Sequence, residues 1–258
     1  MSNITVNDRY MAIADTKREG TNLTSILPSN DTLRLTRCAW LTYAWLLQHS
    51  KFNVNDAEDH YYIYNNAYNN GDIAAVTGYR TDSISAAKRD LINAGLLRKT
   101  KSSGKIVWIL TADPRNFAMA AMPLKVLDFF LTLKDSVFPY KDTLMRAYGV
   151  LKLAKRGGAD SYSISAIMTV LHKDRCNMES RLEVMCCLGL LKELGLLKTE
   201  EYSYTNSKGK KCINYKILSI GGSVEDILAH LEDGEADGVI AKAAAGARVQ
   251  LSTDIVEE

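Results

Sequence analysis

Cysteine and histidine are scarce in this 258-residue chain, which has five cysteines and four histidines and no C-x-x-C pair. Cys186 and Cys187 are neighbours and therefore make a poor disulfide framework. We expect reduced, buried thiols, no structural zinc and no metal site. The alternative is a metal site assembled from His172, Cys176 and Cys186.

Long apolar runs are also missing. No run approaches the roughly 20 apolar residues that a membrane-spanning helix needs. The first ten residues, MSNITVNDRY, contain no apolar core of the kind found in a secretory signal peptide. We therefore expect a cytoplasmic protein with no membrane partner.

Catalytic motifs are absent as well. The sequence has no G-x-x-x-x-G-K-[S/T] phosphate loop. Tyr64 and Tyr68 have the spacing of paired DNA-nicking tyrosines, but the His-x-His metal pair of such enzymes is missing and His60 stands alone. We interpret these tyrosines as strand and packing residues, and we expect a protein that is not an enzyme and needs no cofactor.

The charge is distributed unevenly. The net charge is only +2, yet residues 222–258 hold nine acids against Lys242 and Arg248, a balance of −7, so residues 1–221 carry +9. A basic body suggests a polyanionic partner, with ordinary solubilising charge as the alternative. The acidic end suggests a flexible tail.

Apolar periodicity and turn residues predict a series of helices and hairpins that occurs twice. The order is helix, short strand, helix, helix, hairpin. In the first series these elements are residues 33–49, 61–64, 71–78, 81–94 and 98–110, and in the second the helices are 142–155, 163–171 and 177–194, followed by a hairpin from 198 to 220. A connecting helix is expected at 123–134, since Pro123 suits a first helical turn.

The two series share a corner. L-I-N-A-G-L-L-R-K (91–99) is echoed one hundred residues later by L-K-E-L-G-L-L-K-T (191–199). At that offset Ile84, Lys88, Leu91 and Ala94 fall on Val184, Leu188, Leu191 and Leu194, and three of the four pairs are apolar on both sides. The fold class expected is mainly α with small β-hairpins (α+β), built from two similar halves.

The first half resembles the winged helix-turn-helix family. The residues that carry the resemblance are D-I-A-A-V-T-G-Y (72–79), S-I-S (83–85), L-I-N-A-G-L-L (91–97) and the Lys-rich hairpin after them. The resemblance covers residues 33–112 well and 141–218 less well, and Lys88 stands where the family usually has an apolar residue. It implies two winged helix-turn-helix domains in tandem, whose second helix enters the DNA major groove while the hairpin, or wing, touches the backbone.

A narrower resemblance comes from T-R-C-A-W-L-T-Y-A-W-L-L-Q-H followed by Y-Y-I-Y-N-N-A-Y-N-N-G-D-I-A-A-V-T-G-Y. This succession is similar to the N-terminal domain of plasmid and phage replication initiators. It implies five segments: an N-terminal arm (1–30), a DNA-binding domain (31–113), a linker with the connecting helix (114–140), a second domain for assembly or a second DNA contact (141–221) and the acidic tail (222–258).

The helix from residue 81 has small polar residues at its N-terminal end, which would let its backbone lie deep in a major groove. Ala86 keeps that surface low. The hairpin after it offers lysines for phosphates, a contact that would be salt-dependent and independent of sequence. The expected base-reading residues are Arg80, Thr81, Ser83, Ser85 and Arg89, and the expected phosphate contacts are Lys99, Lys101 and Lys105.

The second half lacks this polar helix. Glu183, Met185 and Cys186 occupy the positions of Ser83, Ser85 and Ala86, and Glu179 adds another acid. The helix is apolar nearly all round, which is typical of a buried helix. We expect it to pack against a partner or against the helix at 123–134. We also expect a homodimer that forms through the second domain or through that connecting helix. Five basic residues outside the helix could still hold a DNA backbone: Lys173, Arg175, Lys208, Lys210 and Lys211.

Three functions are consistent with these patterns. The first is a plasmid or phage initiator that binds double-stranded DNA at origin repeats. The second is a winged-helix transcriptional regulator. The third is a winged-helix scaffold that binds proteins and no DNA, which the acidic tail favours and the basic first hairpin opposes.

Overall fold

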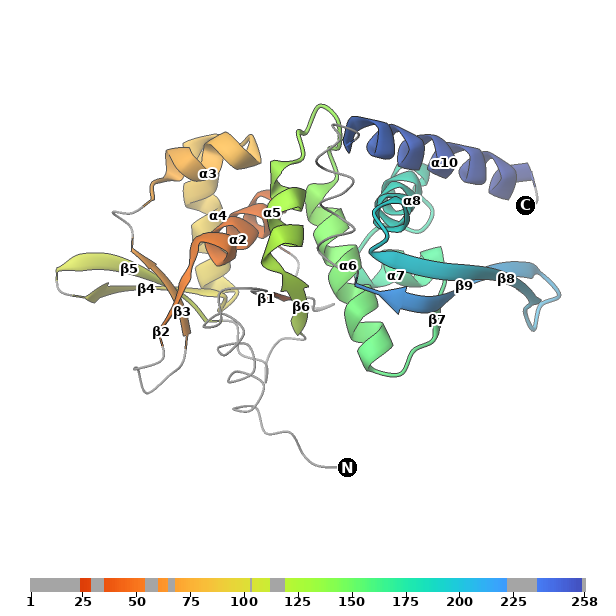
Figure 1. Ribbon diagram of the computed structural model, residues 1–258, viewed down its shortest axis with the longest axis horizontal. Coiled ribbons are helices and arrows are strands. Elements are labelled where there is room, and N and C mark those ends of the chain that lie inside the picture. The colour runs from red at the N-terminus through yellow and green to blue at the C-terminus, as the bar shows by residue number, and fades with distance from the viewer. Residues whose placement is uncertain are drawn as a thin grey trace, which may run out of the picture. The chain divides into compact units, whose positions relative to one another are not determined.

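The computed structural model describes residues 24–28, 35–53, 60–64, 68–102, 104–111, 119–221 and 236–256. Within these ranges the chain forms eight helices and nine short strands, all paired in antiparallel sheets. The mixed α+β class with small hairpins is therefore confirmed. The chain divides into two compact units, Met1–Leu133 and Lys134–Glu258 (Figure 1).

The core of the first unit is built around helix α2 (Arg37–His49), whose residues from Ala39 to Leu47 are all buried. Thr36 begins the helix, because its hydroxyl accepts a hydrogen bond from the Ala39 amide. Helix α5 (Leu124–Thr132) packs against α2. The helix expected at 123–134 is thus α5, and it belongs to the first unit, whereas the sequence placed it in a linker ending at residue 140.

A four-stranded sheet in the order β2-β3-β5-β4 completes this unit. The predicted strand is β3 (His60–Tyr64), and the predicted hairpin is β4 (Leu97–Ser102) with β5 (Lys105–Leu110). Residues Lys51–Asn53 form the edge strand β2 against β3.

A separate two-stranded sheet joins β1 (Thr24–Pro28) to β6 (Met119–Pro123), with Ile26 opposite Ala121. The sequence predicted an extended arm and a linker of unspecified structure here. Neither segment has a local pattern that points to a partner almost one hundred residues away.

Helices α3 (Asn70–Thr77) and α4 (Thr81–Asn93) follow β3. A capping box between Asn69 and Asp72 starts α3, and Gly78, in the left-handed region at φ 74°, ends it. Arg80 is the N-cap of α4 and makes no side-chain capping bond. Thr81 and Asp82 lie within its first turn.

The second unit repeats this order. It contains α6 (Lys141–Arg156), β7 (Ser161–Tyr162), α7 (Ile164–Val170), α8 (Met178–Glu193), β8 (Leu197–Thr205) and β9 (Lys211–Ile220). Its sheet has the order β7-β9-β8, equivalent to β3-β5-β4 in the first unit. The predicted repetition of helix, strand, helix, helix and hairpin is confirmed.

The shared G-L-L corner has the same backbone in both units. Gly95 and Gly195 each have φ 70°, a conformation that favours glycine. The Leu96 carbonyl accepts from the Thr111 amide at 3.0 Å, and the Leu196 carbonyl accepts from the Gly221 amide at 2.8 Å. The sequence echo therefore marks one local structure used twice.

The acidic end differs from the expected flexible tail. Residues Ala236–Val256 form helix α10, which packs against α8 with Ile240, Ala243 and Ala247 buried. Alanine has the highest helix propensity, and its small side chain lets two helices approach closely. A helix considered at 224–231 lies outside the described residues. No helix in the described ranges is long and apolar enough to cross a membrane.

Candidate nucleic-acid interface

Helix α4 has two distinct faces. Ile84, Ala87 and Leu91 are buried against the core, together with Lys88. At about 3.6 residues per turn, the residues pointing the opposite way are Asp82, Ala86, Arg89 and Asn93, which we call the α4 outer face. Ala86 is half-buried and the other three are exposed.

The predicted base-reading residues are divided between this face and its edges. Arg80, Thr81 and Arg89 are exposed, and Arg89 lies centrally on the outer face. Ser83 lies on one flank and Ser85 on the other. The Ser85 hydroxyl accepts from Asn70 Nδ2 at 2.7 Å and donates to the Thr81 carbonyl at 3.1 Å. Ser85 therefore ties α4 to α3, a role that the sequence did not reveal.

Lys88 is a buried cation at the junction of α3, α4 and the hairpin. Only 7 % of it is exposed. Its ammonium donates to Asn70 Oδ1 at 2.7 Å and lies 5.0 Å from the centre of the Trp108 ring. Desolvation lowers the pKa of Lys88 to about 8. The sequence marked Lys88 as a departure from the family, but it did not show that Asn70 and Trp108 are its partners.

The hairpin lysines fall on two faces of the sheet. Lys99 pairs with Trp108 and Lys101 with Ile106, and residues opposite or two apart on antiparallel strands share a face. Because Trp108 contacts Lys88 of α4, Lys99 and Lys101 lie on the α4 side of the hairpin. Lys105 alternates onto the other side. Of the three lysines predicted to contact phosphates, two thus lie on the α4 side of the hairpin and one lies on the opposite side.

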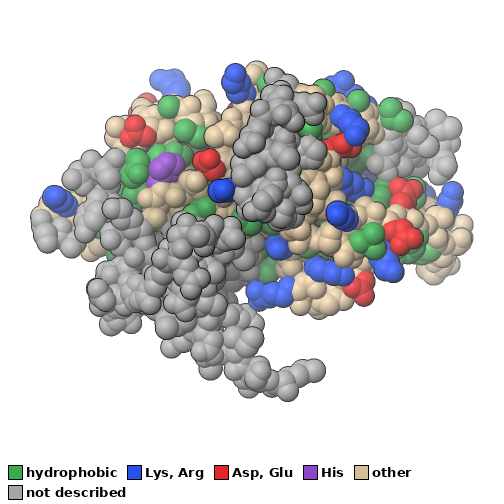
Figure 2. All heavy atoms as spheres, in the orientation of Figure 1, with side chains coloured by type: hydrophobic (Ala, Val, Ile, Leu, Met, Phe, Trp, Pro, Cys, Tyr) green, Lys and Arg blue, Asp and Glu red, His purple; other side chains and the backbone are tan. Residues whose placement is uncertain are grey.

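The exposed charge around α4 and the hairpin is mostly positive. Two acids, Asp82 and Asp90, stand against six exposed cations: Arg80, Arg89, Arg98, Lys99, Lys101 and Lys105. Figure 2 shows basic side chains, in blue, on the visible surface of both units. Such a surface attracts a polyanion at low ionic strength.

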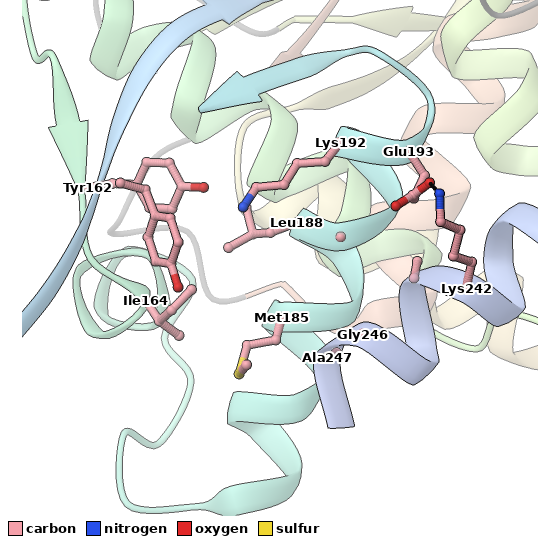
Figure 3. A pocket seen from close by; sticks show the side chains of 12 residues that line it. Tyr162, Ile164, Met185, Leu188, Lys192, Glu193, Lys242, Gly246 and Ala247 are labelled. Carbon is pink, nitrogen blue, oxygen red and sulfur yellow. Dashed lines mark hydrogen bonds and ion pairs between the residues drawn. The ribbon is translucent and has the colours of Figure 1, made fainter. Parts of the chain in front are cut away.

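The corresponding helix of the second unit, α8, is covered. Met185 and Cys186 are each 4 % exposed. At Gly189, an added Cβ would lie 3.3 Å from the Ala243 carbonyl oxygen of α10. Lys242 of α10 also pairs with Glu193 of α8 at 2.6 Å, and Figure 3 shows the two helices side by side. The sequence predicted that α8 packs on a partner or on the helix at 123–134. Within the second unit, α8 packs on α10.

Glu183 and Lys173 are paired with each other. The Lys173 ammonium contacts Glu183 Oε2 at 2.7 Å, and the Thr143 hydroxyl donates to Glu183 Oε1. Both ion-pair side chains are largely buried, at 22 % and 14 % exposed. Lys173 therefore neutralises an internal carboxylate, which argues against its predicted contact with DNA. Arg175 is exposed.

The hairpin of the second unit carries the remaining predicted contacts. Lys208, Lys210 and Lys211 are exposed at its tip. The tip turn is held by Asn206 Oδ1, which accepts from the amides of Lys208 at 2.9 Å and Lys210 at 3.0 Å. This arrangement gathers three cations at the end of one hairpin.

Among the described residues, no group of three or more His, Cys, Asp or Glu side chains is placed to hold a metal ion. The set of His172, Cys176 and Cys186, considered from the sequence, does not form such a group. No protein-family model, curated protein or solved structure matches this chain.

Proposed function

We propose that each unit is a winged helix-turn-helix domain and that the first one binds double-stranded DNA. Helix α4 would enter the major groove with its outer face, and the β4–β5 hairpin would contact the phosphate backbone. The observation that carries this proposal is the placement of Arg89 on an exposed helix face, with Lys99 and Lys101 on the α4 side of the adjoining hairpin.

The residues divide the work as follows. Arg89 reaches base edges past the small Ala86, and a well-placed arginine recognises guanine by two hydrogen bonds. Arg80 and Thr81 lie at the helix start, where backbone amides also favour a phosphate. Lys99 and Lys101 bind phosphates without reading sequence. Ser85, Asn70 and Lys88 hold α4 in place and do not read bases.

The biological role that we propose is initiation of plasmid or phage replication at repeated origin sites, with no enzymatic step and no cofactor. It rests on the order of elements and on the sequence resemblance. A transcriptional regulator is the second candidate. A scaffold without DNA binding is disfavoured by the excess of exposed cations around α4.

Self-assembly into a homodimer, through the second unit or the connecting helix, is also part of the proposal, but the surface that it uses cannot be the buried apolar residues of α5 or the part of α8 that α10 covers. The apolar residues Val126, Leu127 and Phe130 of α5 are fully buried. Met185 and Cys186 of α8 are buried too, in a helix that α10 packs against. Sedimentation of the full chain, alone and with DNA, measures the oligomeric state directly.

The test of DNA binding is the affinity of the full chain for random duplex DNA over a range of salt concentrations. We expect binding that weakens steeply with salt, by about 0.9 in log–log slope for each phosphate contact. Lys101→Ala should lower that slope by about one contact. Lys105→Ala is the matched control, because it removes the same charge from the opposite side of the hairpin and should change the slope less.

Recognition is tested with sites selected from a random duplex library. Arg89→Ala should reduce the difference in binding free energy between selected and random sites by about 1–3 kcal/mol. Lys101→Ala should lower the affinity for all sequences alike. Direct repeats beside an AT-rich region near the gene would support the initiator over the regulator. Absence of duplex binding at low salt would contradict both.

A further inference from the structure

Two tyrosines are exposed side by side on the outer half of the β8–β9 hairpin. Tyr202 and Tyr204 are 40 % and 44 % exposed. They are two residues apart on β8, so they share one face of the sheet. Their ring centres are 6.5 Å apart and the rings are tilted by 39°. A pair of neighbouring aromatic rings on a strand surface is a ready platform for other flat groups.

One of these rings is anchored by its hydroxyl. Tyr202 pairs across the strands with Asn214, whose Nδ2 donates to the Tyr202 hydroxyl at 3.2 Å. The hydroxyl is thereby satisfied by the protein, and the ring is held at the surface. The entropy lost when a ligand stacks on a ring that is already ordered is correspondingly small.

A groove adjoins this platform. It has a volume of about 640 Å³ and runs between the start of α7, α8 and the hairpin. It exists because β7 pairs only with Tyr215 and Lys216, which leaves the end of the longer β9 beyond it. Its lining includes Tyr204, three cations (Arg181, Lys210 and Lys211) and the serines Ser163 and Ser165. Among the residues that the structure describes, no acidic one lines it.

Aromatic rings beside a cationic groove match the chemistry of a single nucleic-acid strand. Unpaired bases stack on aromatic side chains, and the phosphates that join them follow a positive groove. A duplex cannot use such a platform, since its bases are already stacked on one another. An acidic peptide could bind the cations, but it would gain little from the two tyrosines.

We propose that the outer half of the β8–β9 hairpin binds single-stranded nucleic acid, with bases stacked on Tyr202 and Tyr204 and phosphates held by Arg181, Lys210 and Lys211. This activity goes beyond the duplex binding proposed for the first unit and does not depend on it. It gives the second unit a nucleic-acid contact that leaves the packing of α8 on α10 undisturbed.

The experiment is fluorescence anisotropy of a labelled oligothymidylate, which forms no duplex with itself, titrated with the full chain at low salt. Replacing both rings in Tyr202→Ala/Tyr204→Ala should weaken binding at least tenfold, because each lost stacking contact is substantial. The double variant Tyr202→Phe/Tyr204→Phe keeps both ring faces and should bind within about threefold of the wild type, since stacking needs no hydroxyl. Lys210→Ala/Lys211→Ala should reduce the salt slope by about 0.7 per phosphate contact.

The controls separate this site from the first unit. Arg89→Ala, which removes one charge from the first unit, should lower oligothymidylate affinity far less than the double alanine variant does, whatever it does to duplex binding. Oligothymidylate binding by a chain that fails to bind duplex would support this site and contradict the DNA-binding role of α4. The proposal is overturned if oligothymidylate does not bind at low salt, or if the double alanine variant binds as tightly as the wild type. Displacement by polyglutamate together with unchanged binding of the alanine variant would identify an acidic-peptide surface instead.

Discussion

Helices α4 and α8 occupy equivalent places in the two units but present very different surfaces. Ala86, Arg89 and Asn93 on the α4 outer face correspond, one hundred residues later, to Cys186, Gly189 and Glu193 on α8. The first set borders solvent, and the second lies against or beside α10. The difference shows that a helix–turn–helix–hairpin framework does not decide by itself whether its second helix can meet a ligand.

The two hairpins diverge in a complementary way. The strands of the first are six residues long, and its exposed positions are mainly basic. Those of the second are nine and ten residues long, with exposed tyrosines and a basic tip. At the positions compared here, the exposed cations of the second unit thus lie on its hairpin tip, whereas the first unit also exposes Arg89 on its helix.

Equivalent residues of the two units can be exchanged. The largest expected effect on stability is at positions 88 and 188. Leu188 is 3 % exposed and lies one helical turn before Lys192, so Leu188→Lys would bury a cation beside another cation. We expect a loss of about 3–5 kcal/mol in the free energy of unfolding of the second unit. Leu188→Met is the control and should cost less than about 1.5 kcal/mol. Urea denaturation measures both, and a tolerated lysine would mean that the two sites are more alike than their contacts indicate.

The next effect is at 89 and 189. Gly189→Arg would place a long side chain where even a Cβ lies 3.3 Å from the Ala243 carbonyl oxygen. We expect it to cost about 2–4 kcal/mol or to detach α10. Hydrogen exchange in 239–249 should then become fast, while exchange in the first unit stays unchanged. The reciprocal Arg89→Gly should cost only about 1 kcal/mol, the helix propensity of glycine. Unchanged protection of α10 in Gly189→Arg would contradict the packing described for α8.

The helices, the hairpins and the repeated corner could be predicted from the sequence because each depends on local chemistry. Periodic apolar residues define α4 and α6, and glycines with positive φ define the turns at Gly78, Gly95 and Gly195. Arg89 could be found for the same reason, since its exposure follows from the helical spacing of its buried neighbours.

The features that sequence reasoning missed depend on partners far apart in the chain. Strand β1 pairs with β6, which lies almost one hundred residues away. Lys88 contacts Asn70 and Trp108, and both are about twenty residues away in the sequence. The tail was interpreted from its acidic charge, which obscured the helix propensity of its alanines. The face of α8 that α10 covers could not be predicted, because it depends on how α10 packs against α8.

A third change removes the buried charge of the first unit. Because the pKa of Lys88 is lowered to about 8 from 10.5, the unfolded chain holds this proton more tightly than the folded one. The free energy of unfolding should therefore rise with pH between about 8 and 10.5. Lys88→Met should stabilise the first unit by about 1–2 kcal/mol at pH 7, less than the full linkage energy because Asn70 Oδ1 loses its donor. Thermal unfolding at several pH values measures both the rise in stability with pH and the effect of the substitution. A lower melting temperature for Lys88→Met at pH 7 would show that the hydrogen bond to Asn70 outweighs the desolvation of the lysine.

The smallest effect concerns Lys173. Its ion pair with Glu183 distinguishes it from the exposed cations of the hairpin tip. Lys173→Met should cost about 1–2 kcal/mol, since it leaves the partly buried Glu183 without its ion-pair partner. It should not change the salt dependence of nucleic-acid binding, because its charge is already neutralised within the unit. Lys208→Ala, which removes an exposed charge at the tip, should do the opposite and leave stability within about 0.5 kcal/mol. Denaturation and anisotropy measurements on the two variants test this division. A smaller salt slope in Lys173→Met would mean that Lys173 contacts nucleic acid. The second unit would then bind nucleic acid beside the turn between α7 and α8 as well as at its hairpin.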